Sequence, residues 1–129
     1  MDIMNNRRRI LIIDDEPDIT TIFKIGLESS DRLFKVDTFT DPILALSNYR
    51  PGLYDLIMLD VHMPQMDGFD LHKRIKDIDS KAKICFITAS EAYYENCRSE
   101  EIAKLDKDLF IQKPISLEEL EKQVNKILE

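Results

Sequence analysis

The sequence predicts an α/β protein in which a parallel sheet is covered by helices on both faces. Short apolar runs alternate about five times with amphipathic segments, and the run Leu56 to Leu59 is apolar on both faces of a strand. With 129 residues, the chain has room for one hydrophobic core. We therefore expect a single domain over residues 1–129, with its core at about 9–128 and with right-handed crossovers between strands.

The first half of the chain predicts two strands and two helices. An apolar run from Ile10 to Ile13 stops at an acidic residue, and the segment from Phe34 to Phe39 alternates as a strand does. Between them, a helix with proline in its first turn is marked by Ile19, Ile22, Phe23 and Leu27. Asp41 as an N-cap followed by Pro42 predicts a second helix, which a Pro51-Gly52 turn closes.

The second half predicts three helices and three strands. The strands are Leu56 to Leu59, Ile84 to Ile87 and Leu109 to Ile111. A third helix is marked by Phe69, Leu71, Ile75 and Ile78, and a more polar fourth helix is expected over residues 91–105. A capping box at Ser116 and Glu119 opens the last helix, with these residues pointing inward: Leu117, Leu120, Val124, Ile127 and Leu128.

Charge and composition exclude several classes of function. The net charge of −7 and the sequence pI of about 4.9 disfavour direct binding of nucleic acid. No apolar stretch is long enough to span a bilayer, so no membrane association is expected. Two cysteines without an export signal suggest free thiols in a reducing compartment, and we therefore expect a cytoplasmic location.

Polar side chains gather where the predicted strands end. Asp14, Asp15 and Glu16 follow the first strand, and Asp60 ends the third; Thr88 ends the fourth, and Lys113 follows the fifth. The carboxyl ends of parallel strands share one edge of a sheet, so these groups should converge. Carboxylates held this close repel one another, and a divalent hard cation would relieve the repulsion. Mg²⁺ fits best, since it takes one or two carboxylates, waters and a phosphate oxygen.

Four islands of sequence carry a resemblance to a known family. They are Asp14-Asp15, the segment Leu59-Asp60-Val61-His62-Met63-Pro64-Gln65-Met66-Asp67-Gly68, Thr88-Ala89 and Lys113-Pro114. In this order, each at the end of a predicted strand, they resemble the response-regulator receiver family over about Arg9 to Leu128. The resemblance implies a flavodoxin-like (βα)5 fold with the strand order 2-1-3-4-5.

The resemblance also implies a magnesium site. Asp15 and Asp60 would bind Mg²⁺ directly, the backbone carbonyl of His62 would be a third protein ligand, and Asp14 would act mainly through water. The side chain of His62 would border the phosphoryl site. Gly68 would occupy a turn after the metal-binding loop where a small residue is needed.

By the same resemblance, Asp60 would be the nucleophile that accepts a phosphoryl group and forms an acyl phosphate. Lys113, ahead of a cis proline, would pair with one phosphoryl oxygen, and the hydroxyl of Thr88 would donate to another. Phe110 matches the aromatic switch position, where the ring turns inward when Thr88 moves. A plain role for Phe110 in the strand core is equally compatible with the sequence.

The family implies partners as well. A sensor histidine kinase, a phosphotransfer protein or a small acyl phosphate would supply the phosphoryl group. The surface around the helix expected over residues 91–105, the strand Leu109 to Ile111 and the last helix would then control an unidentified downstream protein. The chain would have no enzymatic activity beyond self-phosphorylation and self-dephosphorylation. We expect a monomer, because Gln123 and Asn125 stand where the winged-helix subgroup has the basic residues of its dimer interface.

Three other functions compete with this interpretation. An aspartyl-phosphate hydrolase would need a second acid at position 62, where this chain has His62. A flavin carrier would need a hydroxyl- or glycine-rich phosphate loop after the first strand, where this chain has Asp14-Asp15-Glu16. A receiver-like module that is not phosphorylated would not require the complete set of acids, threonine and lysine. Incubation with acetyl phosphate and Mg²⁺, followed by intact mass, separates these possibilities.

Overall fold

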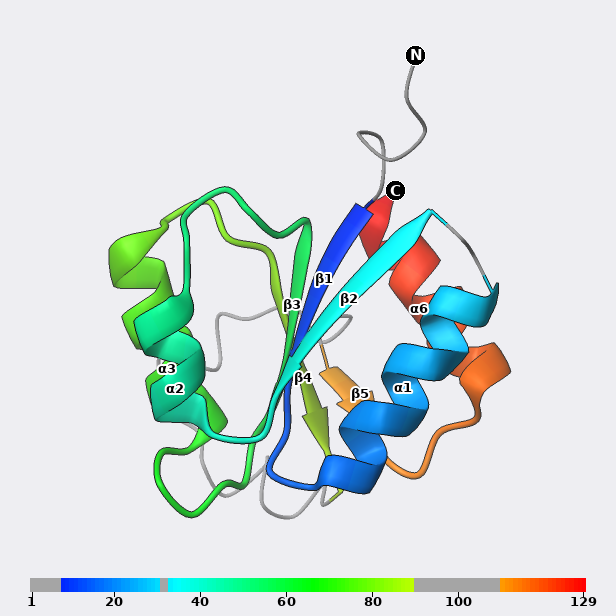
Figure 1. Cartoon of the computed structure of the whole chain (residues 1–129), viewed down its shortest axis with the longest axis horizontal. Coiled ribbons are helices and arrows are strands. Elements are labelled where there is room, and N and C mark those ends of the chain that lie inside the picture. The colour runs from blue at the N-terminus through cyan, green and yellow to red at the C-terminus, as the bar shows by residue number, and fades with distance from the viewer. Residues whose placement is uncertain (1–7, 31–32, 90–109) are drawn as a thin grey trace.

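The computed structural model describes residues 8–30, 33–89 and 110–129, and these form a five-stranded parallel sheet flanked by helices (Figure 1). The strand order is β2-β1-β3-β4-β5, which confirms the expected fold class and topology. The strands are β1 (Arg8–Ile13), β2 (Phe34–Phe39), β3 (Leu56–Asp60), β4 (Ile84–Thr88) and β5 (Phe110–Gln112). The helix expected over residues 91–105 and the first residue expected in the last strand, Leu109, lie outside the described residues.

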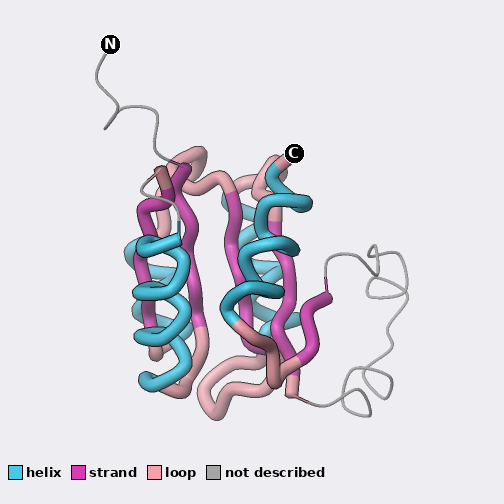
Figure 2. The backbone as a smooth tube through the Cα atoms, turned by 90° about the vertical axis from the view of Figure 1, so that its right-hand side faces the viewer, coloured by secondary structure: helices cyan, strands magenta, loops and turns pink. Residues whose placement is uncertain are grey.

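Among the described residues, two helices pack on each face of the sheet. Figure 1 shows α1 (Pro17–Ser30) and α6 (Leu117–Leu128) on one face and α2 (Pro42–Asn48) and α3 (Gly68–Ile78) on the other. Figure 2 shows the strands standing side by side, with helices in front of them and behind them. The described chain therefore has the layered, doubly wound arrangement of a parallel α/β sheet.

Each face of the sheet has its own apolar core. One core joins alternate residues of the strands to Phe23 and Leu27 of α1 and to Leu120 and Val124 of α6. The other joins the opposite strand residues to α2 and α3. Every residue of β3 and β4 is buried, as expected for central strands covered on both sides.

The helices begin where the sequence predicted. Asp41 accepts hydrogen bonds from the backbone N–H groups of Ile43 and Leu44 at the start of α2. The hydroxyl of Ser116 accepts one from the N–H of Glu119 at the start of α6. Such caps satisfy N–H groups that the first helical turn leaves without partners, and each contributes about 1 kcal/mol.

One inward-facing residue was predicted wrongly. Leu117 keeps 41% of its surface exposed, whereas Leu120 and Val124 are fully buried. Leu117 is the first residue of α6, at the rim of the core, and its side chain covers Gly26 of α1. Helical periodicity identifies the buried face, but it does not show where the neighbouring helix stops covering that face.

Cys85 lies in β4, within the run Ile84 to Ile87 that was predicted as a strand, and it is fully buried. Burial raises the pKa of its thiol to about 12, so the reactive thiolate is scarce at neutral pH. Within residues 8–30, 33–89 and 110–129, no helix is both long enough and apolar enough to cross a membrane.

Candidate functional site

The carboxyl ends of four strands bring the predicted site residues together. Asp14 follows β1, Asp60 and Thr88 are the last residues of β3 and β4, and Lys113 follows β5. Parallel pairing aligns these ends, because Asp60 is opposite Ile87 and the neighbouring residue Thr88 is opposite Gln112. The convergence predicted from the sequence is therefore present.

A pocket of about 450 Å³ opens between these strand ends. Its lining residues are Asp15, Glu16, Asp60, His62, Thr88, Ala89 and Lys113. Asp14 does not line the pocket and has no exposed surface, whereas Asp60 and Thr88 each expose 5%. A small anion or a hydrated cation in this pocket would meet mostly carboxylates, one hydroxyl and one ammonium group.

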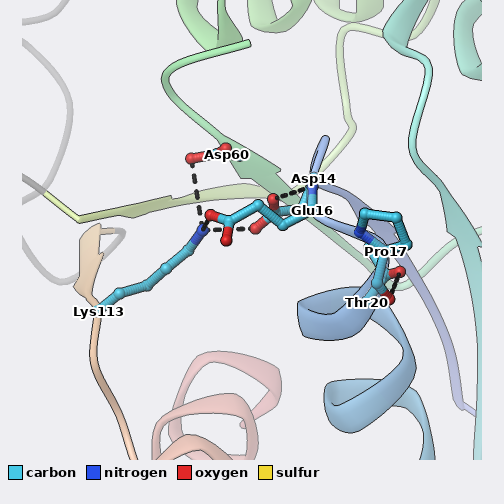
Figure 3. A network of polar contacts seen from close by, with 6 residues as sticks. All are labelled: Asp14, Glu16, Pro17, Thr20, Asp60 and Lys113. Carbon is cyan, nitrogen blue, oxygen red and sulfur yellow. Dashed lines mark hydrogen bonds and ion pairs between the residues drawn. The ribbon is translucent and has the colours of Figure 1, made fainter.

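Lys113 is the cation of the site (Figure 3). Its Nζ lies 2.6 Å from Oδ2 of Asp14 and 3.7 Å from Oδ1 of Asp60. Its backbone N–H donates to the carbonyl of Thr88, and the Lys113-Pro114 peptide is cis, as expected. Burial by itself would lower the pKa of Lys113, but the hydrogen bond and charge of Asp14, with the charges of nearby carboxylates, raise it, so Lys113 is protonated at neutral pH.

The surroundings of Asp60 disfavour the ionised form of its carboxyl group. Burial and the negative charge of Asp14 raise the pKa of its carboxyl group from 3.8 to about 7. Lys113 acts in the opposite direction, but Asp15 adds to the increase. The ionised form of Asp60 therefore needs more positive charge than Lys113 alone supplies.

Three carboxylates are close enough to one another that they could hold a metal ion. Asp14, Asp15 and Asp60 place one carboxylate oxygen each within 4.8 Å of the others. The raised pKa of Asp60 indicates that a divalent cation would relieve a repulsion already present, and oxygen ligands of this kind suit Mg²⁺. The exposed side chain of His62 borders the pocket, as expected, and the role of its carbonyl stays a prediction.

Gly68 packs against the backbone of Asp60. It is the first residue of α3, and its N–H donates to the carbonyl of Val61 at 2.8 Å. A Cβ atom at this position would overlap the carbonyl oxygen of Asp60 and approach Cα of Val61 to 2.9 Å. The predicted need for a small residue is confirmed, and its cause is this close approach of two backbone segments.

Phe110 belongs to a group of packed rings. It is partly buried and stacks on Phe86, with ring centroids 5.0 Å apart. Phe86 also contacts Phe69 at 5.0 Å and His72 at 5.4 Å. The core role of Phe110 is thus supported, and its role as a switch stays a prediction. His72 of α3 is partly buried, with its ring beside that of Phe86.

Glu16 is a site residue whose role the sequence did not reveal. Its Oε1 lies 3.7 Å from Nζ of Lys113, and its side chain lines the pocket. Its position next to Asp14-Asp15 was the available signal. The spacing along the chain, however, does not show that the loop between β1 and α1 places this side chain beside Lys113.

Comparison with known proteins identifies a family that matches the part of the chain containing these site residues. The family described as the response regulator receiver domain matches residues 10–125. This chain belongs to that family. The receiver is 31% identical to the alkaline phosphatase synthesis transcriptional regulatory protein PhoP of Bacillus subtilis over 121 residues, covering 94% of this chain and 48% of PhoP. It is 30% identical to the transcriptional regulatory protein DltR of Streptococcus agalactiae, covering 87% of this chain and 48% of DltR. The receiver therefore spans about half the length of these curated relatives.

Solved receivers share its fold. The non-phosphorylated HemR receiver domain of Leptospira biflexa superposes with a TM-score of 0.80 at 28% identity, covering 95% of both chains. The response regulator TrrA of Thermotoga maritima, in complex with Mg²⁺ and BeF, superposes with a TM-score of 0.76 at 31% identity, covering 93% of this receiver and 98% of TrrA. TrrA has also been solved in complex with the histidine kinase ThkA; that structure gives a TM-score of 0.74 at 32% identity, covering 95% of this receiver and 99% of the matched chain.

Proposed function

We propose that this receiver accepts a phosphoryl group on Asp60 with the help of Mg²⁺ and transmits the change to a partner protein. The observation that carries the proposal is the composition of the pocket at Asp60. A nearly buried carboxylate there is flanked by two further acids, by the ammonium of Lys113 and by the hydroxyl-bearing Thr88. This set supplies a nucleophile and groups that neutralise charge on a transferring phosphoryl group.

Asp14, Asp15 and Asp60 would hold the metal, with the backbone carbonyl of His62 as a further ligand. When bound, Mg²⁺ would neutralise charge on the carboxylates and on the phosphoryl oxygens. The carboxylate of Asp60 would then be ionised at neutral pH, as a nucleophile must be. Support comes from the three oxygens within 4.8 Å of one another and from the Mg²⁺ complex of the similar receiver TrrA.

The reaction would be an in-line displacement at phosphorus. A carboxylate oxygen of Asp60 would form a new P–O bond while the bond between phosphorus and the donor breaks, and the donor would leave with the bonding electron pair. For a phosphohistidine donor this is a P–N bond, and the imidazole nitrogen keeps the pair. Lys113 would pair with one equatorial oxygen and Thr88 would donate to another, so that the developing charge is held between fixed groups.

The donor would be a sensor histidine kinase, a phosphotransfer protein or a small acyl phosphate. The ThkA–TrrA complex supports a kinase partner, since TrrA is 32% identical to this chain. The change would be transmitted to an unidentified downstream protein through the surface around the helix expected over residues 91–105, β5 and α6. Thr88 and Phe110 would be the switch. We further propose that the receiver is a cytoplasmic monomer and that its own chemistry is limited to gaining and losing the phosphoryl group.

Intact-mass measurement tests the proposal. With acetyl phosphate and Mg²⁺, the wild-type receiver should gain the mass of one phosphoryl group, and the Asp60→Asn variant should gain none. Asp77→Asn, the same change at an exposed acid of α3 that does not line the pocket, is the matched control and should still be labelled. A labelled Asp60→Asn variant would show that another residue is the acceptor. An unlabelled wild-type protein that still binds Mg²⁺ would favour the receiver-like module that is not phosphorylated.

A further inference from the structure

Glu16 is a charged residue at the pocket that phosphoryl transfer, as proposed above, does not use. Its backbone is fixed, because its N–H donates to Oδ1 of Asp14 at 3.0 Å and its carbonyl accepts from the N–H groups of Ile19 and Thr20. Its side chain is 61% exposed and lines the pocket. The start of α1 therefore presents a solvated carboxylate to any molecule that enters.

The same carboxylate competes for Lys113. Nζ of Lys113 lies 3.7 Å from Oε1 of Glu16 and also 3.7 Å from Oδ1 of Asp60, so the ammonium is shared between the two carboxylates (Figure 3). Its short contact, at 2.6 Å, is with the fully buried Asp14. An incoming phosphoryl oxygen would have to replace Glu16 beside Lys113, and it would approach against the charge of Glu16.

We propose that Glu16 determines which phosphoryl donors the receiver accepts. By repelling anions and occupying Lys113, it disfavours doubly charged small acyl phosphates. Donors with a P–N bond and a lower net charge, such as phosphoramidate, are disfavoured less. This inference rests on the proposed phosphoryl transfer to Asp60 and adds a determinant of donor specificity to it.

Coulomb's law sets the size of the effect. A donor with two negative charges at about 7 Å from Glu16, in a solvated pocket, is disfavoured about tenfold at low salt, and screening reduces this to about threefold at physiological ionic strength. A donor with one net negative charge is disfavoured by only about the square root of each of these factors. Because Glu16 is exposed, the effect should depend strongly on salt.

The test compares Glu16→Gln and Glu16→Lys with the wild type. Intact mass gives the rate of phosphorylation by acetyl phosphate and by phosphoramidate, which carries one net negative charge near neutral pH. Each variant is assayed at saturating Mg²⁺, found by its own thermal-shift titration, since losing a nearby carboxylate will weaken Mg²⁺ binding. Asp18→Asn is the matched control, because Asp18 is an exposed acid in the first turn of α1 that does not line the pocket.

The rate with acetyl phosphate should rise from Glu to Gln to Lys at position 16, by about tenfold for Glu16→Gln at low salt and by about threefold at physiological ionic strength. The gain should be smaller with phosphoramidate, it should shrink as salt is added, and Asp18→Asn should show little of it. Equal gains with both donors, or a gain that salt does not change, would overturn the donor-specificity role while leaving phosphoryl transfer intact. If the wild type takes a phosphoryl group from neither donor, the proposed function fails and this inference fails with it.

Discussion

Replacing Asp60 with asparagine should stabilise the metal-free receiver. The carboxyl group of Asp60 has a pKa near 7 in the folded protein, against 3.8 as its ordinary value, because it is buried beside Asp14 and Asp15. The folded state thus binds this proton more tightly than the unfolded chain does. The free energy of unfolding should therefore fall as pH rises from about 4 through about 7, and asparagine, which cannot ionise, should abolish that contribution.

The magnitude follows from the two pKa values. Each pKa unit corresponds to about 1.4 kcal/mol, so ionised Asp60 costs the folded state on the order of 4 kcal/mol above pH 7. Water and counterions entering the pocket reduce this cost, and we expect Asp60→Asn to gain about 2–4 kcal/mol near pH 8. Near pH 4 the two proteins should be almost equally stable.

Urea unfolding in the presence of a chelator, followed from about pH 4 to about pH 8.5, measures the difference. The matched control is Asp77→Asn, since Asp77 is an exposed acid on α3 away from the pocket. Its stability difference from the wild type should be small at every pH. A difference for Asp60→Asn that does not change with pH, or that favours the wild type near pH 8, would refute the assignment of repulsion to this site.

Three further predictions concern the metal, the backbone and the assembly. Millimolar Mg²⁺ should stabilise the wild type by about 1–3 kcal/mol, as judged by thermal unfolding, and Asp15→Asn should lose most of this stabilisation. Equal stabilisation of both proteins by Mg²⁺ would contradict the metal site. Gly68→Ala should lower the free energy of unfolding by about 1–3 kcal/mol, since the alanine Cβ would overlap the carbonyl of Asp60. An unchanged urea unfolding curve would disprove the close approach of the Gly68 and Asp60 backbones. With beryllofluoride and Mg²⁺ the receiver should sediment as a monomer, because Gln123 and Asn125 carry no charge for a dimer interface. A two-fold symmetric dimer through α6 and the helix expected over residues 91–105 would show this prediction wrong.

Much of the fold was predictable because hydrophobic patterning is local. The doubly apolar runs at Leu56 to Leu59 and Ile84 to Ile87 lie in β3 and β4, the central buried strands. The caps at Asp41 and Ser116 begin α2 and α6 as predicted. Each of these signals depends on a few neighbouring residues, so the sequence carries it without knowledge of the rest of the fold.

Convergence of the site was also determined by the sequence. Parallel strands joined by right-handed crossovers place their carboxyl ends at one edge, so acids, threonine and lysine that follow separate strands must meet there. Asp14, Asp60 and Lys113, distant in sequence, accordingly form the ion pairs of one site.

The tertiary structure determined the burial of each of those side chains and the residues that it contacts. Asp14 is fully buried against Lys113, whereas its neighbour Asp15 lines the pocket. The side chain of Glu16 lies beside Lys113, and the ring of His72 packs against Phe86. Leu117 stays at the rim of the core because α1 covers it only in part. Spacing along the chain determines which strand end or helix face a residue occupies. The rotamer and the partner of each side chain depend on atoms from other elements, and these meet only once the sheet and its helices have packed.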